Sequence, residues 1–267
     1  MLPRKRFGQN FLHDLGVIQH LMDVIAPRPG DALVEIGPGL GALTVPLLQR
    51  VNALDVIELD RDLLGPLQQR CAGLGELRIH AADALRFDFS TLAPAGTTLR
   101  IVGNLPYNIS TPLLFHLLSQ AELVRDMHFM LQKEVVDRLA AAPGTADYGR
   151  LSVMVQFRCA VQPLFTIGPQ AFHPVPKVDS AVVRLVPHAV PPADVRDAAV
   201  FGRVVKQAFA QRRKTLHNNF KGLLDDERLR SVGVDPGWRA ERLTLAQFAA
   251  LSNMVDGTDT VPADKAG

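Results

Sequence analysis

Four consecutive residues, Asn104-Leu105-Pro106-Tyr107, combine groups that can bind a flat base carrying an exocyclic amine. They follow an apolar run over residues 99–103 whose composition predicts a buried strand. The Asn104 amide and a nearby backbone carbonyl can accept hydrogen bonds from an amino group, and the Tyr107 ring can stack on the base. Asn and Pro also favour turns, so these residues alone leave a base-binding turn and a structural turn equally open.

A second candidate site is the glycine-rich segment over residues 35–41, between an expected strand at 32–36 and an expected helix. Glycines at this position let the backbone approach a ligand closely and leave helix N–H groups free to bind it. Glu58 ends the next expected strand, about 20 residues after the glycines, where an acid can bind both ribose hydroxyls of an adenosine. The alternative is a tight strand-to-helix turn without a ligand. The glycines are Gly37, Gly39 and Gly41.

The acidic residues around this loop favour S-adenosylmethionine over a dinucleotide as the cofactor. The loop has the spacing G-x-G-x-G with Ala42 in the last position, which departs from the G-x-G-x-x-G pattern of NAD sites. Glu35, directly before the loop, would repel a pyrophosphate but tolerate a sulfonium and an α-amino group. Asp83, which follows the third expected strand, can accept a hydrogen bond from the cofactor's adenine amine, or it can cap a helix.

Strands and helices alternate through the first part of the chain, which predicts an α/β domain with a mostly parallel sheet and ligands at the carboxyl ends of its strands. A Pro-rich loop joins the last two expected strands, without a helix between them, so we expect an antiparallel pair there. The expected strands cover 32–36, 54–59, 77–81, 99–102, 127–131, 164–167 and 181–186, and the expected helices 15–25, 40–49, 63–71, 113–118 (with Ser110 as N-cap) and 133–142.

The end of the chain has only helical spacing, around residues 201–209, 223–229 and 243–254. We therefore expect a first domain over 1–188, a linker over 189–193, a small all-helical domain over 194–255 and a disordered tail over 256–267.

The charge distribution points to a nucleic acid, although the net charge of +2 is small. Residues 194–222 hold seven lysines and arginines against two aspartates, and such a basic tract attracts phosphate backbones. The commoner explanation of a charge run is a solvated helix face. We expect Arg203, Lys206, Arg213, His217 and Lys221 to lie along one helix face. The candidate RNA-binding residues are Arg4, Lys5, Arg6, Lys177, Arg203, Lys206, Arg212, Arg213, Lys214 and Lys221.

Several other classes of protein are disfavoured by composition. The two cysteines are far apart and the histidines have no metal-binding spacing, so we expect neither a disulfide framework nor a metal site. No apolar run is long enough to span a membrane, and the basic start lacks the apolar region of a signal peptide. We expect a cytoplasmic protein that acts as a monomer.

The two candidate sites above occur in order with three further segments, 8–12, 172–180 and 212–216. Together these motifs resemble the ribosomal RNA adenine N6,N6-dimethyltransferases, most closely the bacterial small-subunit type. The resemblance runs from residue 8 to about residue 250. Ala82 stands where the family commonly has Gly, which puts only the local loop shape in doubt. The matching segments are 8–12, 35–41, Glu58, Asp83, 104–107, 172–180 and 212–216.

The resemblance implies a Rossmann-like methyltransferase sheet, mostly parallel with one antiparallel strand, followed by a small all-helical C-terminal domain that helps to hold RNA. It implies that Tyr107 and Phe172 sandwich the target adenine. The reaction it implies is dimethylation of N6 on two adjacent adenosines, in a hairpin loop near the 3′ end of small-subunit (16S) ribosomal RNA. The S-adenosylmethionine site would be lined by Asn10, Leu12, Gly37, Glu58, Asp83 and Asn104.

Four other interpretations compete with this one. DNA adenine methyltransferases more often have Asp-Pro-Pro-Tyr at the position of residues 104–107, and glutamine-modifying methyltransferases have Asn-Pro-Pro-Tyr, so Leu105 disfavours both. Large-subunit enzymes of the same family share the early motifs, but residues 172–180 and 212–216 favour the small-subunit type. A non-catalytic nucleic-acid-binding protein on a methyltransferase scaffold is also possible, although the intact Asn104 and Tyr107 argue against it.

Overall fold

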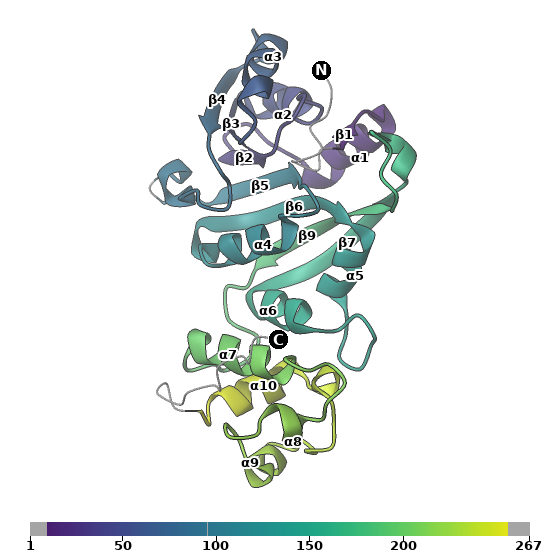
Figure 1. Ribbon diagram of the computed structural model, residues 1–267. Coiled ribbons are helices and arrows are strands. Elements are labelled where there is room, and N and C mark those ends of the chain that lie inside the picture. The colour runs from purple at the N-terminus through teal and green to yellow at the C-terminus, as the bar shows by residue number, and fades with distance from the viewer. Residues whose placement is uncertain (1–9, 95, 256–267) are drawn as a thin grey trace. The chain divides into compact units, whose positions relative to one another are not determined.

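The computed structural model describes residues 10–94 and 96–255, which form two compact units (Figure 1). The first unit comprises residues 1–136 and 160–187, and the second comprises residues 137–159 and 188–267. The basic residues Arg4, Lys5 and Arg6 and the tail over 256–267 lie outside the described residues, so the expectations for them are not addressed by the structure.

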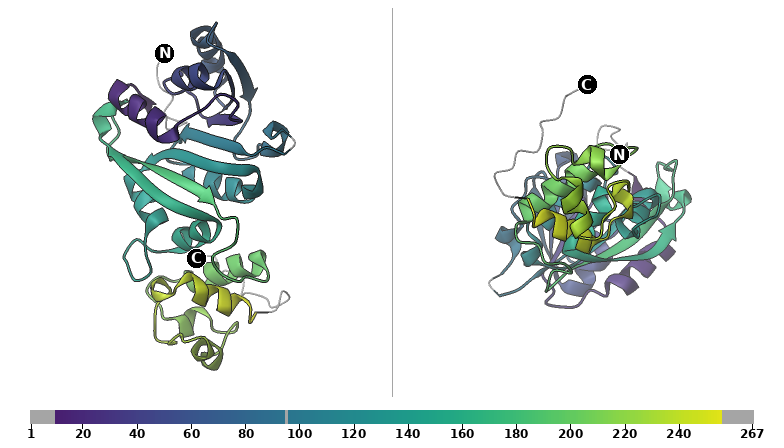
Figure 2. Two further views of the ribbon diagram at one scale, coloured as in Figure 1. Left: turned by 180° about the vertical axis from the view of Figure 1, so that it is seen from behind. Right: turned by 90° about the horizontal axis from the view of Figure 1, so that it is seen from below.

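A seven-stranded sheet in the order β4-β3-β2-β5-β6-β9-β7 forms the centre of the first unit. Neighbouring strands from β4 to β6 pair in parallel, whereas β9 pairs antiparallel with β6, as the expected fold class requires. Seen from behind, β9 and β7 run along one edge (Figure 2, left). The strands are β2 (Leu33–Ile36), β3 (Ala53–Glu58), β4 (Glu76–Ala81), β5 (Leu99–Asn104), β6 (Val124–Gln132), β7 (Cys159–Ile167) and β9 (Ser180–Pro187).

The order of these strands places a ligand crevice between β2 and β5. From β2 the chain moves outward through β3 to β4, then returns to β5 on the other side of β2 and continues outward to β6. Open parallel sheets bind ligands where the order reverses in this way, beyond the carboxyl ends of the strands. The glycine-rich loop follows β2 and Asn104 ends β5, so both candidate sites lie at this crevice.

The helices of the first unit follow the sequence expectation with shifted ends. α2 begins at Thr44, because the glycine-rich loop continues as turns until Leu43, and this start places Pro46 in the first helical turn, where its missing N–H is tolerated. α2 packs on β3, and α3 packs on β3 and β4. The helices are α1 (Leu15–Ile25), α2 (Thr44–Val51), α3 (Arg61–Cys71) and α4 (Ser110–Leu118), with short 3₁₀ turns at Phe89–Leu92, Ala121–Leu123 and Pro169–Ala171. Another helix, α5 (Lys133–Ala140), begins in the first unit and ends in the second.

The expected N-cap at Ser110 is wrong. Ile109 occupies the N-cap position of α4 and makes no side-chain cap hydrogen bond. The Ser110 hydroxyl instead donates to the Tyr107 carbonyl at 3.1 Å. The Ser110 hydroxyl therefore stabilises the turn that contains Tyr107 through this hydrogen bond.

A two-stranded sheet joins segments from opposite ends of the first unit. β1 (Phe11–Leu12) pairs antiparallel with β8 (Phe172–His173), with Leu12 opposite Phe172. The His13 amide extends the pairing by donating to the Ala171 carbonyl at 3.0 Å. Strands of two residues have no periodicity, so the sequence could not predict this sheet.

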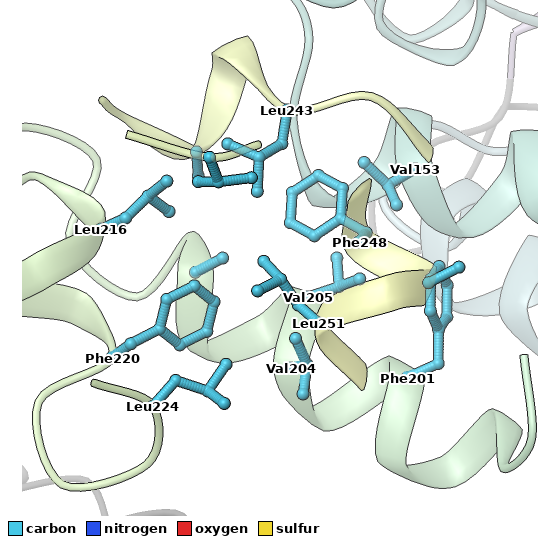
Figure 3. Close-up of a cluster of buried hydrophobic side chains, with 14 of the residues drawn as sticks. Val153, Phe201, Val204, Val205, Leu216, Phe220, Leu224, Leu243, Phe248 and Leu251 are labelled. Atoms are coloured by element: carbon cyan, nitrogen blue, oxygen red, sulfur yellow. The ribbon is translucent and has the colours of Figure 1, made fainter. Parts of the chain in front are cut away.

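The second unit is helical and includes a helix that the sequence analysis missed. Residues 137–159 belong to the second unit together with the C-terminal helices, which differs from the expected boundary at 188. The Phe157 ring lies 4.5 Å from that of Phe201, and Val153 lies in the same buried cluster (Figure 3). The helices are α6 (Arg150–Arg158), α7 (Ala198–Ala208), α8 (Leu216–Asn219), α9 (Asp226–Ser231) and α10 (Leu245–Ser252), with a 3₁₀ turn at Ala240–Arg242.

A buried ion network anchors β5 at the end opposite the crevice, and its loss should destabilise the protein. Arg100 donates from Nε to Asp126 Oδ1 at 2.9 Å, from Nη2 to Asp126 Oδ2 at 3.1 Å and from Nη1 to Asp31 Oδ2 at 2.8 Å.

Arg100→Met leaves two buried carboxylates without their main partner, so we expect a loss of about 3–5 kcal/mol in the free energy of unfolding, measured by urea denaturation. Arg125→Met is the control, because Arg125 is mostly exposed and reaches Asp31 at 3.3 Å; it should cost less than about 1 kcal/mol. Equal losses of unfolding free energy in the two variants would contradict the claim that Arg100 is the main partner of the buried carboxylates.

Candidate functional site

The glycine-rich loop and the Asn104 motif line one pocket of about 600 Å³ in the first unit. Ile36, the last residue of β2, lies opposite Gly103 in the parallel pairing of β2 with β5. A Cβ on Gly103 would come within 2.6 Å of the Ile36 carbonyl oxygen, so glycine allows the two strand ends to approach. The volume is in the range of sites for small molecules. The two candidate sites of the sequence are therefore two walls of the same pocket.

Two of the three loop glycines face the pocket and the third does not. Gly37 and Gly39 line it, with φ angles of 69° and 56° that favour glycine. Gly41 lies outside the lining, and a Cβ there would approach Leu67 Cδ1 to 2.9 Å. Gly41 thus permits close packing of the loop on α3 rather than direct access to a ligand.

The Glu58 carboxylate is held in place by backbone amides at the end of β3. It is 7% exposed and accepts hydrogen bonds from Gly39 N at 3.3 Å and from Asp60 N at 2.8 Å. Burial raises its pKa, and the amide donors oppose that rise. A carboxylate has about four acceptor positions, so these two bonds leave capacity for a pair of ribose hydroxyls.

Asp83 lines the pocket beyond the end of β4, next to Ala82. Its Oδ1 accepts a hydrogen bond from Leu85 N at 3.0 Å within a turn, and no helix begins there, so Asp83 does not cap a helix. Because the other carboxylate oxygen is not used in that bond, the turn is compatible with a contact to an adenine amine.

Glu35 is a buried acid in the pocket wall without a hydrogen bond to its Oε2 atom. It is 2% exposed, and neither Glu35 Oε2 nor the buried Thr44 hydroxyl has a hydrogen-bond partner among the described residues. Burial raises the pKa of Glu35 to about 8, the nearby Thr44 hydroxyl partly opposes this, and the negative charge of Glu58 adds to it. In the free protein Glu35 therefore carries a proton at neutral pH, and a cationic ligand in the pocket would favour its ionised form.

The Asn104 amide is oriented by a hydrogen bond from its Nδ2 to the Asn10 carbonyl at 2.9 Å. This leaves the side-chain oxygen as the acceptor that Asn104 offers to a ligand. A nearby backbone carbonyl is expected to assist it, and of those of Leu105 and Pro106, the Pro106 carbonyl accepts Ile109 N at 3.1 Å within the turn. The Leu105 carbonyl is therefore the better candidate for a second acceptor.

Tyr107 and Phe172, expected to sandwich a base, lie in different surroundings. Tyr107 lines the pocket, and its hydroxyl is 2.9 Å from Ser180 Oγ. Phe172 is 1% exposed and packs in the hydrophobic core, so in this conformation its ring does not face the pocket. The adjacent residue, His173, lines the pocket instead. The pairing of β8 with β1 turns alternate side chains to opposite faces, which explains why Phe172 is buried and His173 is not.

The N-terminal residues Asn10 and Leu12 line the pocket, as the resemblance implied. Their position depends on the β1–β8 sheet. Pocket residues that the sequence analysis did not single out include Leu59, Arg70 and His173; Thr44, whose hydroxyl lies near Glu35, was also missed.

The described basic candidates do not share a helix face, so that expectation is wrong. α7 ends at Ala208 and α8 begins at Leu216, and a loop with Arg213 and Lys214 separates them. The basic candidates other than Arg203, which is half-buried, are exposed, and Arg212 also donates to the Ala146 carbonyl at 2.6 Å. Lys177 is exposed on the loop after β8 in the first unit. The basic candidates are thus spread over helices and loops.

Across residues 10–94 and 96–255, the structure shows no group of three or more His, Cys, Asp or Glu side chains arranged to hold a metal ion. Within the same part of the chain, no helix is both long and apolar enough to cross a membrane.

Comparison with known proteins agrees with the geometry of the pocket. Residues 2–256 match the family model described as ribosomal RNA adenine dimethylase. The chain is 59% identical to ribosomal RNA small subunit methyltransferase A of Methylococcus capsulatus over 255 residues, which are 96% of this chain and 98% of that protein. It is 59% identical to the protein of the same name from Nitrosococcus oceani, over 93% of this chain and 94% of that one.

Two solved structures are similar over almost the whole chain. A dimethyladenosine transferase from Plasmodium falciparum has a TM-score of 0.76 and 25% identity, covering 90% of this chain and 95% of that chain. The 23S rRNA methyltransferase ErmE has a TM-score of 0.70 and 25% identity, covering 92% and 99% respectively.

Proposed function

Since this chain belongs to the ribosomal RNA adenine dimethylase family, we propose that it transfers methyl groups from S-adenosylmethionine to ribosomal RNA. The acceptors are N6 of two adjacent adenosines in a hairpin loop near the 3′ end of the small-subunit (16S) RNA, dimethylated during small-subunit biogenesis in the cytoplasm. We further propose that the protein acts as a monomer without a metal. The observation that carries the proposal is that one pocket is lined both by the glycine-rich loop, which suits a nucleoside cofactor, and by Asn104, whose side-chain oxygen can accept a hydrogen bond from an amino group.

One part of the pocket suits the methyl donor. Gly37 and Gly39 allow close approach of the backbone, Glu58 offers acceptors to ribose hydroxyls and Asp83 offers an acceptor to the adenine amine. Glu35 adds a negative charge once ionised, which suits a cation but not a pyrophosphate. S-adenosylmethionine, when bound, supplies an electrophilic methyl group on a positively charged sulfur.

The other part suits a poor nucleophile that needs orientation rather than a strong base. The N6 lone pair of adenine is delocalised into the ring. Hydrogen bonds accepted by Asn104 Oδ1 and the Leu105 carbonyl would localise that lone pair toward the methyl group. Because the N6 proton becomes acidic only after transfer, a neutral amide suffices, and catalysis is mainly positioning, which can contribute about 7–11 kcal/mol in favourable cases.

Tyr107 should act through its ring rather than its hydroxyl. The target adenine must leave its own stack at a cost of a few kcal/mol, and stacking on an aromatic ring returns about 1–3 kcal/mol. Tyr107→Ala should therefore raise the KM for small subunits about 5- to 150-fold. Tyr107→Phe keeps the ring and loses only the contact with Ser180, so its KM should stay within about threefold. Steady-state methyl transfer measures both, and a Phe variant as impaired as the Ala variant would mean that the hydroxyl is the functional group.

The exposed basic residues of the second unit should contribute a salt-dependent part of RNA affinity. Replacing Arg213 and Lys214 together by Gln should reduce the slope of log affinity against log salt by about one per residue. Arg61→Gln, an exposed position on α3, is the control and should keep the original slope. Binding to small subunits across a salt series measures the slopes. An unchanged slope in the double variant would remove these two residues from the RNA interface.

Transfer of labelled methyl groups separates the enzyme from a non-catalytic scaffold. The acceptors are small subunits from a strain that lacks the modification, and the donor is S-adenosylmethionine labelled on the methyl group. Label in the small-subunit RNA supports the proposal. Tight binding of subunits without any transfer would support the scaffold.

A further inference from the structure

A second cavity, of about 370 Å³, lies in the first unit beyond the end of β6. We refer to it as the side pocket. One wall comes from the last residue of β6 and the first two of α5, and the other from Pro169 and residues 177–179. The first wall consists of Gln132, Lys133 and Glu134.

The side pocket lies next to the methyl-transfer pocket along the same sheet edge. β5 and β6 are parallel neighbours (Figure 1). Asn104 lies opposite Met130 in their pairing, so Gln132 lies two residues beyond that level. Adjacent strands are about 4.8 Å apart and a strand rises about 3.3 Å per residue, so the last residue of β6 lies on the order of 8 Å from the end of β5. A strand of RNA with one base in the first pocket would therefore place a neighbouring nucleotide near the second.

Direct contacts also connect the two pockets. The Tyr107 hydroxyl is 2.9 Å from Ser180 Oγ, and Ser180 directly follows Asp179 of the side pocket. The loop that begins with His173 in the first pocket provides residues 177–179 to the second. The Asp179 carbonyl accepts Lys133 N at 2.9 Å, which fixes this loop against the start of α5.

The lining of the side pocket suits a base with an amino group better than an isolated phosphate. Lys133 and Lys177 are balanced by Glu134 and Asp179, so the lining has no net formal charge. Carboxylates accept hydrogen bonds from amines, and a Gln side chain can pair with both edge atoms of adenine. Val178 is 44% exposed and offers an apolar surface for the face of a base.

From this arrangement we propose that the side pocket binds the nucleotide adjacent to the target adenosine, with its base against Val178. The inference rests on the proposed function, since it assigns a neighbour to the base in the methyl-transfer pocket. It also implies that one of the two adjacent adenosines occupies the side pocket while the other is methylated. The side pocket then assists one of the two methylations and not the other. Each of the two adjacent adenosines has the other on only one side, 5′ or 3′, and the side pocket binds a neighbour on one of these sides only.

The test combines a change in the protein with a change in the RNA. The protein variant is Val178→Ser, and the control is Val175→Ser, a 51% exposed valine of the same loop that does not line the side pocket. The substrates are small subunits from a strain lacking the modification, with the natural pair or with either adenosine replaced by uridine. Primer extension reports kcat/KM at each remaining adenosine, and thermal denaturation confirms that both variants fold.

With unaltered protein, uridine should lower kcat/KM at its neighbour about tenfold in one of the two arrangements, because a pyrimidine offers less surface and no matching amine. Val178→Ser should lower kcat/KM by a similar factor at the same adenosine of the natural pair, and not at the other. On the affected uridine substrate the same variant should cause little further loss, since the two changes remove one contact. Val175→Ser should match the unaltered protein on every substrate.

Two results would overturn the proposal. One is unchanged activity of Val178→Ser on the natural pair, and the other is an equal loss for this variant on natural and uridine substrates. Either result leaves methyl transfer by the unaltered protein intact, so the proposed function would stand. If the unaltered protein transfers no methyl groups to natural subunits, the proposed function itself is rejected, and the side-pocket assignment with it.

Discussion

Asn104→Ala is expected to lower kcat at least a hundredfold while leaving the affinity for S-adenosylmethionine within about threefold of its original value. Removal of one oriented polar group at a reacting centre typically costs a factor of about 10²–10³ in kcat. The Asn104 side chain is such a group, because its Nδ2 donates to the Asn10 carbonyl and its oxygen is left to accept a hydrogen bond from the N6 amino group. Calorimetry with the donor alone and single-turnover methyl transfer measure the two quantities separately.

The control for Asn104→Ala is Gln68→Ala, which removes an exposed amide on α3 and should alter neither quantity. Turnover near the original value in Asn104→Ala would show that this side chain does not orient the acceptor. An equal loss of turnover and donor affinity would assign Asn104 to the donor instead, through its contact with Asn10.

The affinity for S-adenosylmethionine should fall as the pH drops below about 8, by up to about tenfold per pH unit. Burial raises the pKa of Glu35 to about 8, so below that pH the free protein holds a proton on Glu35. A cationic donor binds the ionised form better, and binding at lower pH must therefore release the proton. Above pH 8 Glu35 is already ionised, and the affinity should level off. Calorimetry from pH 6 to pH 9, in buffers of different ionisation enthalpy, measures both the affinity and the protons released.

Glu35→Gln tests whether Glu35 is the titrating group. Glu58 faces the same pocket and also has a raised pKa, and the Cys71 thiol of α3 lies within the electrostatic influence of Glu35. The Gln variant keeps the size of the side chain but cannot titrate, so its affinity should be lower at pH 9 and nearly independent of pH. A pH dependence that persists in Glu35→Gln would point to Glu58 or to another group.

Local patterns in the sequence predicted the elements with strong periodicity and the site residues at strand ends. The apolar spacing over 15–25 predicted α1, and the alternation of strands and helices predicted the parallel sheet. In such a sheet the loops after neighbouring strands meet at one edge, so Gly37, Glu58 and Asn104 could be assigned to one site before any contact was seen.

The features that the sequence did not predict depend on contacts between distant residues or on a misleading pattern. In α6 the apolar residues Leu151, Val153, Val155 and Phe157 alternate with a period of two, which is typical of a strand. The burial of Phe172 follows from its pairing with Leu12, a contact between residues that are far apart in the sequence. The unpaired Thr44 hydroxyl near Glu35 depends on how α2 packs, which no local pattern reveals.

The account's central claim is that the pocket between β2 and β5 joins a methyl donor to adenine N6. The most direct test is nucleoside analysis of small-subunit RNA, from a strain that lacks the modification, after reaction with labelled S-adenosylmethionine and this protein. The account predicts label in N6,N6-dimethyladenosine, at two residues per subunit, and an initial rate of labelling at least a hundredfold lower with Asn104→Ala. Label in a ribose, in another base or in protein would contradict it.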